Sequence, residues 1–176
     1  MNRMILIGAV LLGLLIGLTA LTACGGSGSG EDGLPTVVSD PVVPAEPDLS
    51  APEPAVSSYL EWVSFAYRMA NSDIATQTMT PWQAVRTDAY IELNRQNGEG
   101  IEQRLLDFSV RDMTEEVTST VIAASERWWF RYFSLDTLRY TSEPHEVSYE
   151  TTYTVVFVDD RWLVDDVDAE PLGPLE

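Results

Sequence analysis

The sequence has few side chains suited to covalent or acid–base chemistry. It holds one thiol, Cys24, one imidazole, His145, and no lysine, so all ten basic residues are arginine. Cys24 ends the run Leu-Thr-Ala-Cys behind a short basic start and a long apolar stretch, which makes it a candidate for modification. His145 follows Ser-Glu-Pro in a polar setting with no orienting partner in the sequence, so we interpret it as a surface or structural residue rather than a catalytic one.

The first 24 residues resemble a bacterial lipoprotein signal with its lipobox. Arg3 supplies positive charge, residues 4–18 are apolar or glycine, and residues 19–23 stay small or apolar, which is the order of a signal peptide. The resemblance implies a diacylglyceryl thioether on Cys24, cleavage before it and N-acylation of the new terminus. Two or more acyl chains (such as palmitate) would anchor the mature protein stably to the cell membrane, facing outside the cytoplasm.

An uncleaved membrane helix is the alternative, because residues 4–23 are just long enough to span a bilayer. A plain spanning helix gives no reason for the only cysteine to follow Leu-Thr-Ala. Gly25, rather than aspartate, follows Cys24, which favours the outer membrane if the cell has two membranes.

Composition limits the classes of partner. The chain of 176 residues has a formal net charge of −18, which argues against binding nucleic acid, whose phosphates would be repelled. Residues 25–30 are only glycine and serine, and residues 31–54 are rich in proline, valine and acidic residues. We therefore predict a signal peptide over 1–23, the lipidated cysteine and a flexible tether over 24–54, one domain over 55–170 and a tail over 171–176.

The sequence of the domain predicts helices followed by strands. Apolar spacing predicts helices over 54–70 and 73–79, and a third that begins at Pro81, carries Trp82, Val85, Ala89 and Leu93 on one face and ends at Gly98. Alternation predicts strands around 106–111 and over 117–128, 147–157 and 161–167, with a tight turn at 159–160. This order gives an α+β fold in which N-terminal helices pack their apolar stripes on one face of a curved antiparallel sheet of about four strands.

Two segments resemble NTF2-like cone domains. Residues 59–73 look like the opening helix of such a domain, ending in Ala-Asn-Ser-Asp. The run Tyr-Glu-Thr-Thr-Tyr-Thr from Tyr149, followed by Asp-Asp-Arg-Trp-Leu-Val from Asp159, looks like its closing hairpin. The pattern is similar to the extracytoplasmic NTF2-like domains of TcaA-type envelope proteins and to the inner-membrane-space domain of plastid-division J-domain proteins. The zinc ribbon and transmembrane helix of TcaA-type proteins are missing from this sequence.

The run Trp-Trp-Phe-Arg-Tyr-Phe over 128–133 is the main candidate for an interaction surface. Alternate residues of a strand face opposite sides, so half of these aromatic rings must point away from one core. Either a loop covers them or they form an exposed patch that marks a partner surface. The residues of this predicted surface are Trp128, Trp129, Phe130 and Tyr132.

Other side chains give weaker signals. Tyr67, Tyr90 and Tyr149 line a cavity or simply form the core, and Glu126 is expected to pair with an arginine across the sheet. One cysteine, one histidine and acidic pairs without the spacing of a calcium loop predict neither a metal nor a cofactor.

These features predict a binding module of the cell envelope rather than an enzyme, with an envelope protein or a small hydrophobic ligand as its partner. A carrier, or an isomerase- or dehydratase-like enzyme using the cone interior, is the alternative, and a structural spacer is another. A carrier or enzyme needs a cavity of several hundred Å³ inside the cone, roughly the size of ligand pockets. A packed cone with Trp129 or Phe130 exposed favours interaction.

Overall fold

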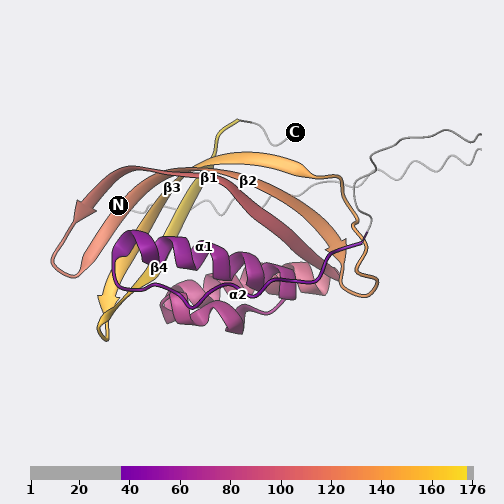
Figure 1. Ribbon diagram of the computed structural model, residues 1–176, viewed down its shortest axis with the longest axis horizontal. Helices are drawn as coiled ribbons and strands as arrows, with labels where there is room; N and C mark the ends of the chain where they lie inside the picture. The colour runs from indigo at the N-terminus through magenta and orange to yellow at the C-terminus, as the bar shows by residue number, and fades with distance from the viewer. Residues whose placement is uncertain (1–36, 174–176) are drawn as a thin grey trace, which may run out of the picture. The chain divides into compact units, whose positions relative to one another are not determined.

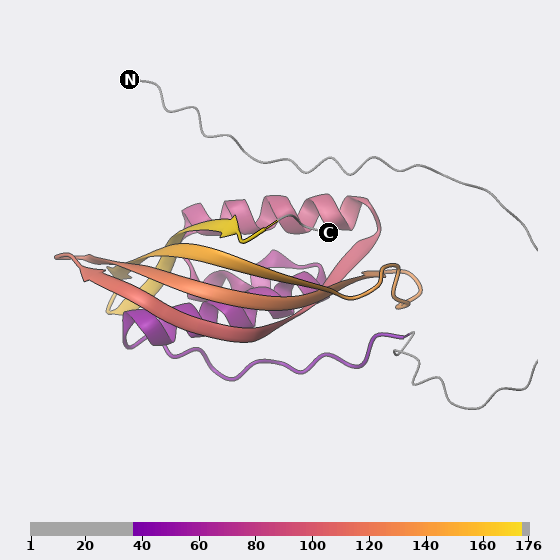
Figure 2. The ribbon, with the colours of Figure 1, turned by 90° about the horizontal axis from the view of Figure 1, so that it is seen from above.

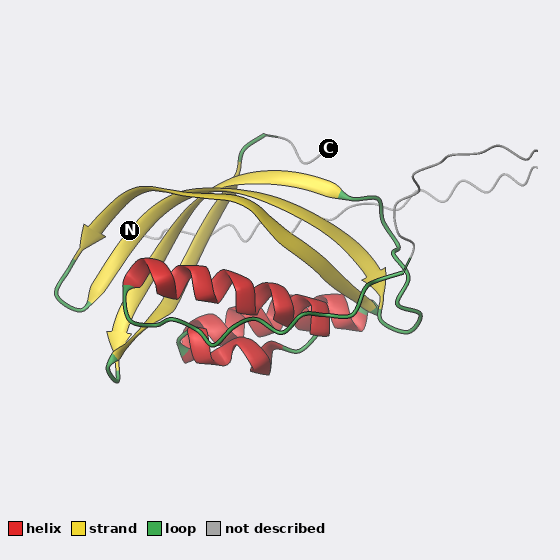
Figure 3. Cartoon of the chain, viewed as in Figure 1, coloured by secondary structure: helices red, strands yellow, loops and turns green. Residues whose placement is uncertain are grey.

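The computed structural model describes residues 37–173. The predicted signal peptide, Cys24 and residues 174–176 lie outside the described residues. Three helical elements precede four strands (Figures 1 and 3): α1 (Pro52–Met69), the 3-10 helix η1 (Ser72–Thr78), α2 (Pro81–Gln96), β1 (Glu99–Glu115), β2 (Ser119–Ser134), β3 (His145–Val158) and β4 (Arg161–Pro171). None of the helices over 37–173 combines the length and apolar character that crossing a bilayer requires.

The helix boundaries follow from local sequence signals. A proline opens α1, and the helix ends where Ala70 adopts a left-handed conformation with φ of 48°. The side chain of Asn71 then accepts a hydrogen bond from the Asp73 N–H and caps η1. The hydroxyl of Thr80 accepts from the Gln83 N–H at the start of α2. All three predicted helices are therefore confirmed, within about two residues at most ends.

The strands form one antiparallel meander in the order β1-β2-β3-β4. Register shifts in β1 and in the β3–β4 pairing mark bulges, which bend and twist long strands. Asp159 and Asp160 both have positive φ and form the predicted tight turn between β3 and β4. β1 begins well before the predicted 106–111, and β2 runs on through the aromatic residues to Ser134.

The helices cover the concave face of the curved sheet (Figures 1 and 3). Apolar side chains of α1, η1 and the inner face of the sheet form the core, among them Val56, Val63, Ala75, Ile122 and Val155. The predicted α+β fold, with helices packed on a curved antiparallel sheet of four strands, is confirmed.

The predicted orientation of α2 is wrong. Its buried residues are Gln83, Thr87 and Ile91, whereas Trp82, Val85 and Leu93 are exposed. The polar residues face inward because the interior offers them partners: the Gln83 side chain donates from Nε2 to the Tyr59 hydroxyl at 2.8 Å. Tertiary hydrogen bonding therefore overrides the apolar stripe of this helix.

Candidate functional site

Residues 37–49 form an extended strap that is bonded to the domain at several points. At one end the Val38 N–H donates to the Leu138 carbonyl at 3.0 Å. Further along, Trp62 Nε1 donates to the Ala45 carbonyl at 3.1 Å and the Asp48 N–H donates to Ser58 Oγ at 2.9 Å. The predicted tether over 24–54 thus includes a segment that packs on the domain.

The strap, α1 and β1 line an open groove of about 800 Å³. This volume falls within the range of ligand-binding clefts. Mostly apolar side chains face it, with a few charged and polar groups between them. The strap contributes Val37, Val42 and Pro44, α1 contributes Leu60, Phe65 and Arg68, and the sheet contributes Glu102, Gln103, Arg104, Leu105 and Trp129.

One wall of the groove is a closed polar network around Glu102. Arg68 forms an ion pair with Glu102 through Nη1 and donates through Nη2 to the Ser39 carbonyl, which ties α1, β1 and the strap together. The Tyr140 hydroxyl donates to the other Glu102 oxygen. Burial and this bond to Glu102 raise the pKa of Tyr140 to about 12. These contacts give the network a structural role in shaping the groove.

Next to this network along β1, Trp129 lies beneath Arg104. The two residues are paired in the β1–β2 register, and the Arg104 guanidinium carbon lies 5.5 Å from the centre of the Trp129 ring. Arg104 is exposed, so its N–H groups can donate to a ligand while the cation stacks on the indole. β1 is also the edge of the sheet, and within residues 37–173 it pairs only with β2.

The predicted aromatic surface divides between the two faces of β2. Trp128 is buried in the core and Trp129 lines the groove on the other face, as strand alternation requires. Phe130 is half-buried, lies 5.8 Å from the Tyr132 ring and stacks on His145 at 5.3 Å. Of the four predicted residues, Trp129 alone lines this groove.

The loop after β2 covers the last residues of its outer face. Tyr140 pairs with Phe133 through an isolated bridge, and its ring lies 4.0 Å from the Arg131 guanidinium carbon. The Phe133 ring also lies directly over Gly100, where an added Cβ would fall 2.8 Å from Cε1 of the ring. A loop thus shields Arg131 and Phe133, while Trp129 keeps access to the groove.

The predicted cavity-lining tyrosines come together on the concave side of the sheet. The rings of Tyr67 and Tyr90 meet edge to face at 5.5 Å, and, besides burial, the neighbouring Tyr90 contributes to raising the pKa of Tyr132. Burial is the main cause that raises the pKa of Tyr67, Tyr132 and Tyr149. Tyr149 lies opposite Glu126 in the β2–β3 register. The four rings form one cluster contributed by α1, α2, β2 and β3.

The predicted ion pair of Glu126 with an arginine is wrong. Glu126 faces the core and is only 6% exposed. Its Oε2 accepts from Trp128 Nε1 at 2.6 Å, and its Oε1 accepts from the Tyr153 hydroxyl. Both carboxylate oxygens are therefore bonded to neutral donors inside the cone. Among the described residues, no group of three or more histidine, cysteine or acidic side chains is placed to hold a metal ion.

Comparisons with known proteins define the fold and leave the family open. No family model matches the chain, and no curated protein matches it. The intermembrane-space region of the chloroplast protein ARC6 is similar in structure, with a TM-score of 0.60 and 16% identity over 68% of this chain and 94% of that one. Its likeness supports the fold alone.

Two further structures are more distant. A putative calcium/calmodulin-dependent protein kinase II association domain from Xanthomonas campestris has a TM-score of 0.46 and 14% identity, over 74% of this chain and 98% of that one. An NTF2-like protein of unknown function from Shewanella oneidensis MR-1 has a TM-score of 0.38 and 15% identity, over 65% of this chain and 95% of that one. NTF2-like proteins are thus among the structural neighbours of this chain.

Proposed function

We propose that the protein is a lipid-anchored, extracytoplasmic lipoprotein whose NTF2-like domain binds an extended segment of an envelope protein in the strap groove. The observation that carries the proposal is the groove itself, about 800 Å³ between the strap, α1 and the free edge of β1. The lipobox-like run that ends at Cys24 supports the anchor.

An extended polypeptide suits this groove better than a compact ligand. The free edge of β1 offers backbone N–H and C=O groups, which give affinity when a peptide adds as a strand. Trp129 offers a rigid apolar surface, and Arg104 beside it offers donors for a carboxylate or carbonyl of the peptide.

The placement of the candidate acid–base groups supports our proposal of binding rather than catalysis. Both oxygens of Glu126 accept hydrogen bonds from core side chains. The His145 ring stacks on Phe130. Neither group lines the groove, so the proposal assigns neither of them a chemical step.

The anchor predicts that the full chain incorporates labelled palmitate in bacteria and that Cys24→Ser abolishes the label. The reason is that Cys24 holds the only thiol in the chain. The measurement is the radioactivity of the immunoprecipitated protein, normalised to its amount. A Cys24→Ser protein that still incorporates palmitate would contradict the anchor.

The groove predicts site-specific crosslinking to a partner. A photoreactive phenylalanine analogue in place of Leu105, which lines the groove, should form adducts in intact envelopes. The same analogue in place of Val117, which is fully exposed outside the groove lining, is the matched control. Arg104→Ala and Trp129→Ala should each lower the adduct yield at least about tenfold, because each removes an anchor of the bound segment.

Mass spectrometry of the adducts provides the decisive reading. One contiguous, extended segment of a single envelope protein supports the proposal. Equal adducts from positions 105 and 117, or adducts that survive both substitutions, would show that the groove does not select the partner. An adduct to a lipid or another small molecule at position 105 would show that the groove binds a small hydrophobic ligand and not a peptide.

A further inference from the structure

Helix α2 exposes an apolar stripe that the fold does not use. Trp82 is 64% exposed, Val85 66% and Leu93 57%, and Tyr90 beside them is 45% exposed. Trp82, Val85, Ala89 and Leu93 recur at three- and four-residue steps, so they cover one side of the helix, and Tyr90 flanks this stripe. Scattered exposed apolar residues are ordinary, but a continuous stripe on one helix indicates a contact surface.

The same helix carries no net charge, although the chain as a whole is strongly acidic. α2 carries two arginines and two carboxylates, whereas the whole chain has a net charge of −18. Arg95 bonds to Glu92 at 2.7 Å, and Arg86 forms an ion pair with Asp166. The charges that flank the stripe are thereby balanced, and the surface is close to neutral.

We infer that the outward face of α2 rests on the surface of a lipid bilayer of zwitterionic headgroups. This inference rests on the lipid anchor in the proposed function. Tryptophan and tyrosine favour the boundary between headgroups and acyl chains, where an apolar ring and a polar atom are both satisfied. A neutral helix suits zwitterionic lipid, because the acidic remainder of the chain is repelled from anionic lipid.

A second copy of the chain fits this face less well than lipid does. The four side chains together expose on the order of 500 Å², so two facing copies would bury roughly 1,000 Å², the lower limit of a specific interface. Such a pair would also bring together two chains of net charge −18. An anchored domain needs only a weak contact, because its tether already holds it near the bilayer.

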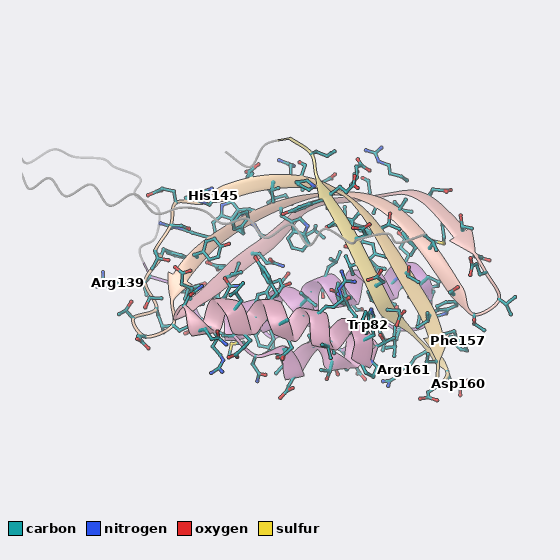
Figure 4. The ribbon with its side chains drawn as sticks, turned by 180° about the vertical axis from the view of Figure 1, so that it is seen from behind. Trp82, Arg139, His145, Phe157, Asp160 and Arg161 are labelled. Carbon is teal, nitrogen blue, oxygen red and sulfur yellow. The ribbon has the colours of Figure 1, made fainter. Side chains whose placement is uncertain are left out.

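A contact between α2 and the bilayer would also determine which way the strap groove faces. Figure 2 shows the strap and α2 on opposite sides of α1, and Figure 4, from behind, shows α2 in front with Trp82 upon it. Contact through α2 therefore turns the groove away from the membrane. Twelve residues lie between Cys24 and Val37, and the thirteen Cα–Cα steps can span at most roughly 45 Å, which allows an anchored domain to make this contact.

The test uses the full-length lipoprotein reconstituted in phosphatidylcholine liposomes. With Cys24 acylated, Ala89→Cys supplies the only free thiol, and a fluorophore attached there reports on the stripe. Val43→Cys, at an exposed strap position, is the matched control. Nitroxide-labelled lipids should quench the probe at position 89 at least about threefold more than the probe at 43, and adding Trp82→Ser and Leu93→Ser should remove the difference.

The outcomes separate this inference from the anchor on which it rests. Flotation of the liposomes first shows whether the protein is anchored; failure to float overturns the anchor and the inference together. Protein that floats while the two probes are quenched equally overturns the inference alone. A probe at position 89 that is shielded in lipid-free detergent, with a dimer mass by light scattering, assigns the stripe to a second copy instead.

Discussion

Replacing Glu126 by alanine should lower the free energy of unfolding by about 3 kcal/mol, because it leaves two buried donors without an acceptor and creates a cavity. Trp128 Nε1 and the Tyr153 hydroxyl both donate to this carboxylate, and Tyr153 is only 1% exposed. Neither donor would reach water in the folded state. An unpaired buried donor costs on the order of 1–3 kcal/mol.

Glu126→Gln is the matched control for this prediction. Its amide oxygen can accept from Trp128 Nε1, and its NH₂ group can donate to the Tyr153 hydroxyl oxygen, which is also an acceptor. We expect a loss of about 1 kcal/mol or less, since side-chain volume and both contacts are kept. Urea unfolding followed by tryptophan fluorescence measures both values. Equal losses for the alanine and glutamine variants would show that the hydrogen bonds of Glu126 do not stabilise the core.

The inward position of Glu126 was available from the sequence. Ile122, Ala124 and Trp128 share its parity, and in a strand residues of one parity face one side. Glu126 therefore had to face the core with them. The predicted ion pair with arginine rested on the charge of Glu126 and not on its position in the strand. What parity could not supply was the identity of the donors, since Tyr153 comes from the neighbouring strand.

The two long helices show when apolar spacing predicts a buried face. α1 buries Val56, Leu60 and Val63 on the predicted stripe, because that stripe meets the sheet. α2 carries a stripe of similar spacing but turns it outward, since Gln83 finds a partner in Tyr59. The spacing of apolar residues in the sequence predicts that a helix has an apolar face. Whether the protein interior or another surface covers that face depends on contacts distant in the sequence.

The groove was not predicted because its walls lack a periodic signal. The strap is a proline-rich segment without helical or strand spacing, and such composition is typical of a spacer. Its bonds to the Ser58 and Trp62 side chains join residues at least ten positions apart. The alternation over 128–133 did predict that half of these rings face away from the core, and Trp129 is one of them. The strap and the edge of β1, which make the Trp129 ring part of a groove, required the tertiary structure.

Raising the pH from 9 to 11 should destabilise the domain by about 2–3 kcal/mol through Tyr59 and Tyr153 alone. Burial is the main cause that raises the pKa of both phenols, and the Glu126 carboxylate further raises that of Tyr153. The folded state therefore keeps protons that the unfolded chain releases near pH 10. Stability is fully present below pH 10 and falls above it, because the unfolded state binds fewer protons there.

This chain isolates the tyrosine effect, because it contains no lysine and arginine stays charged throughout this range. Urea unfolding between pH 8 and 11, with tyrosinate absorbance recorded alongside, measures the slope of stability against pH. Tyr153→Phe removes one group whose pKa is raised, so the slope between pH 10 and 11 should become shallower by about 1 kcal/mol per pH unit. A stability that stays constant to pH 11, or an unchanged slope in Tyr153→Phe, would mean that these phenols ionise in the folded state and that the core around Glu126 admits water.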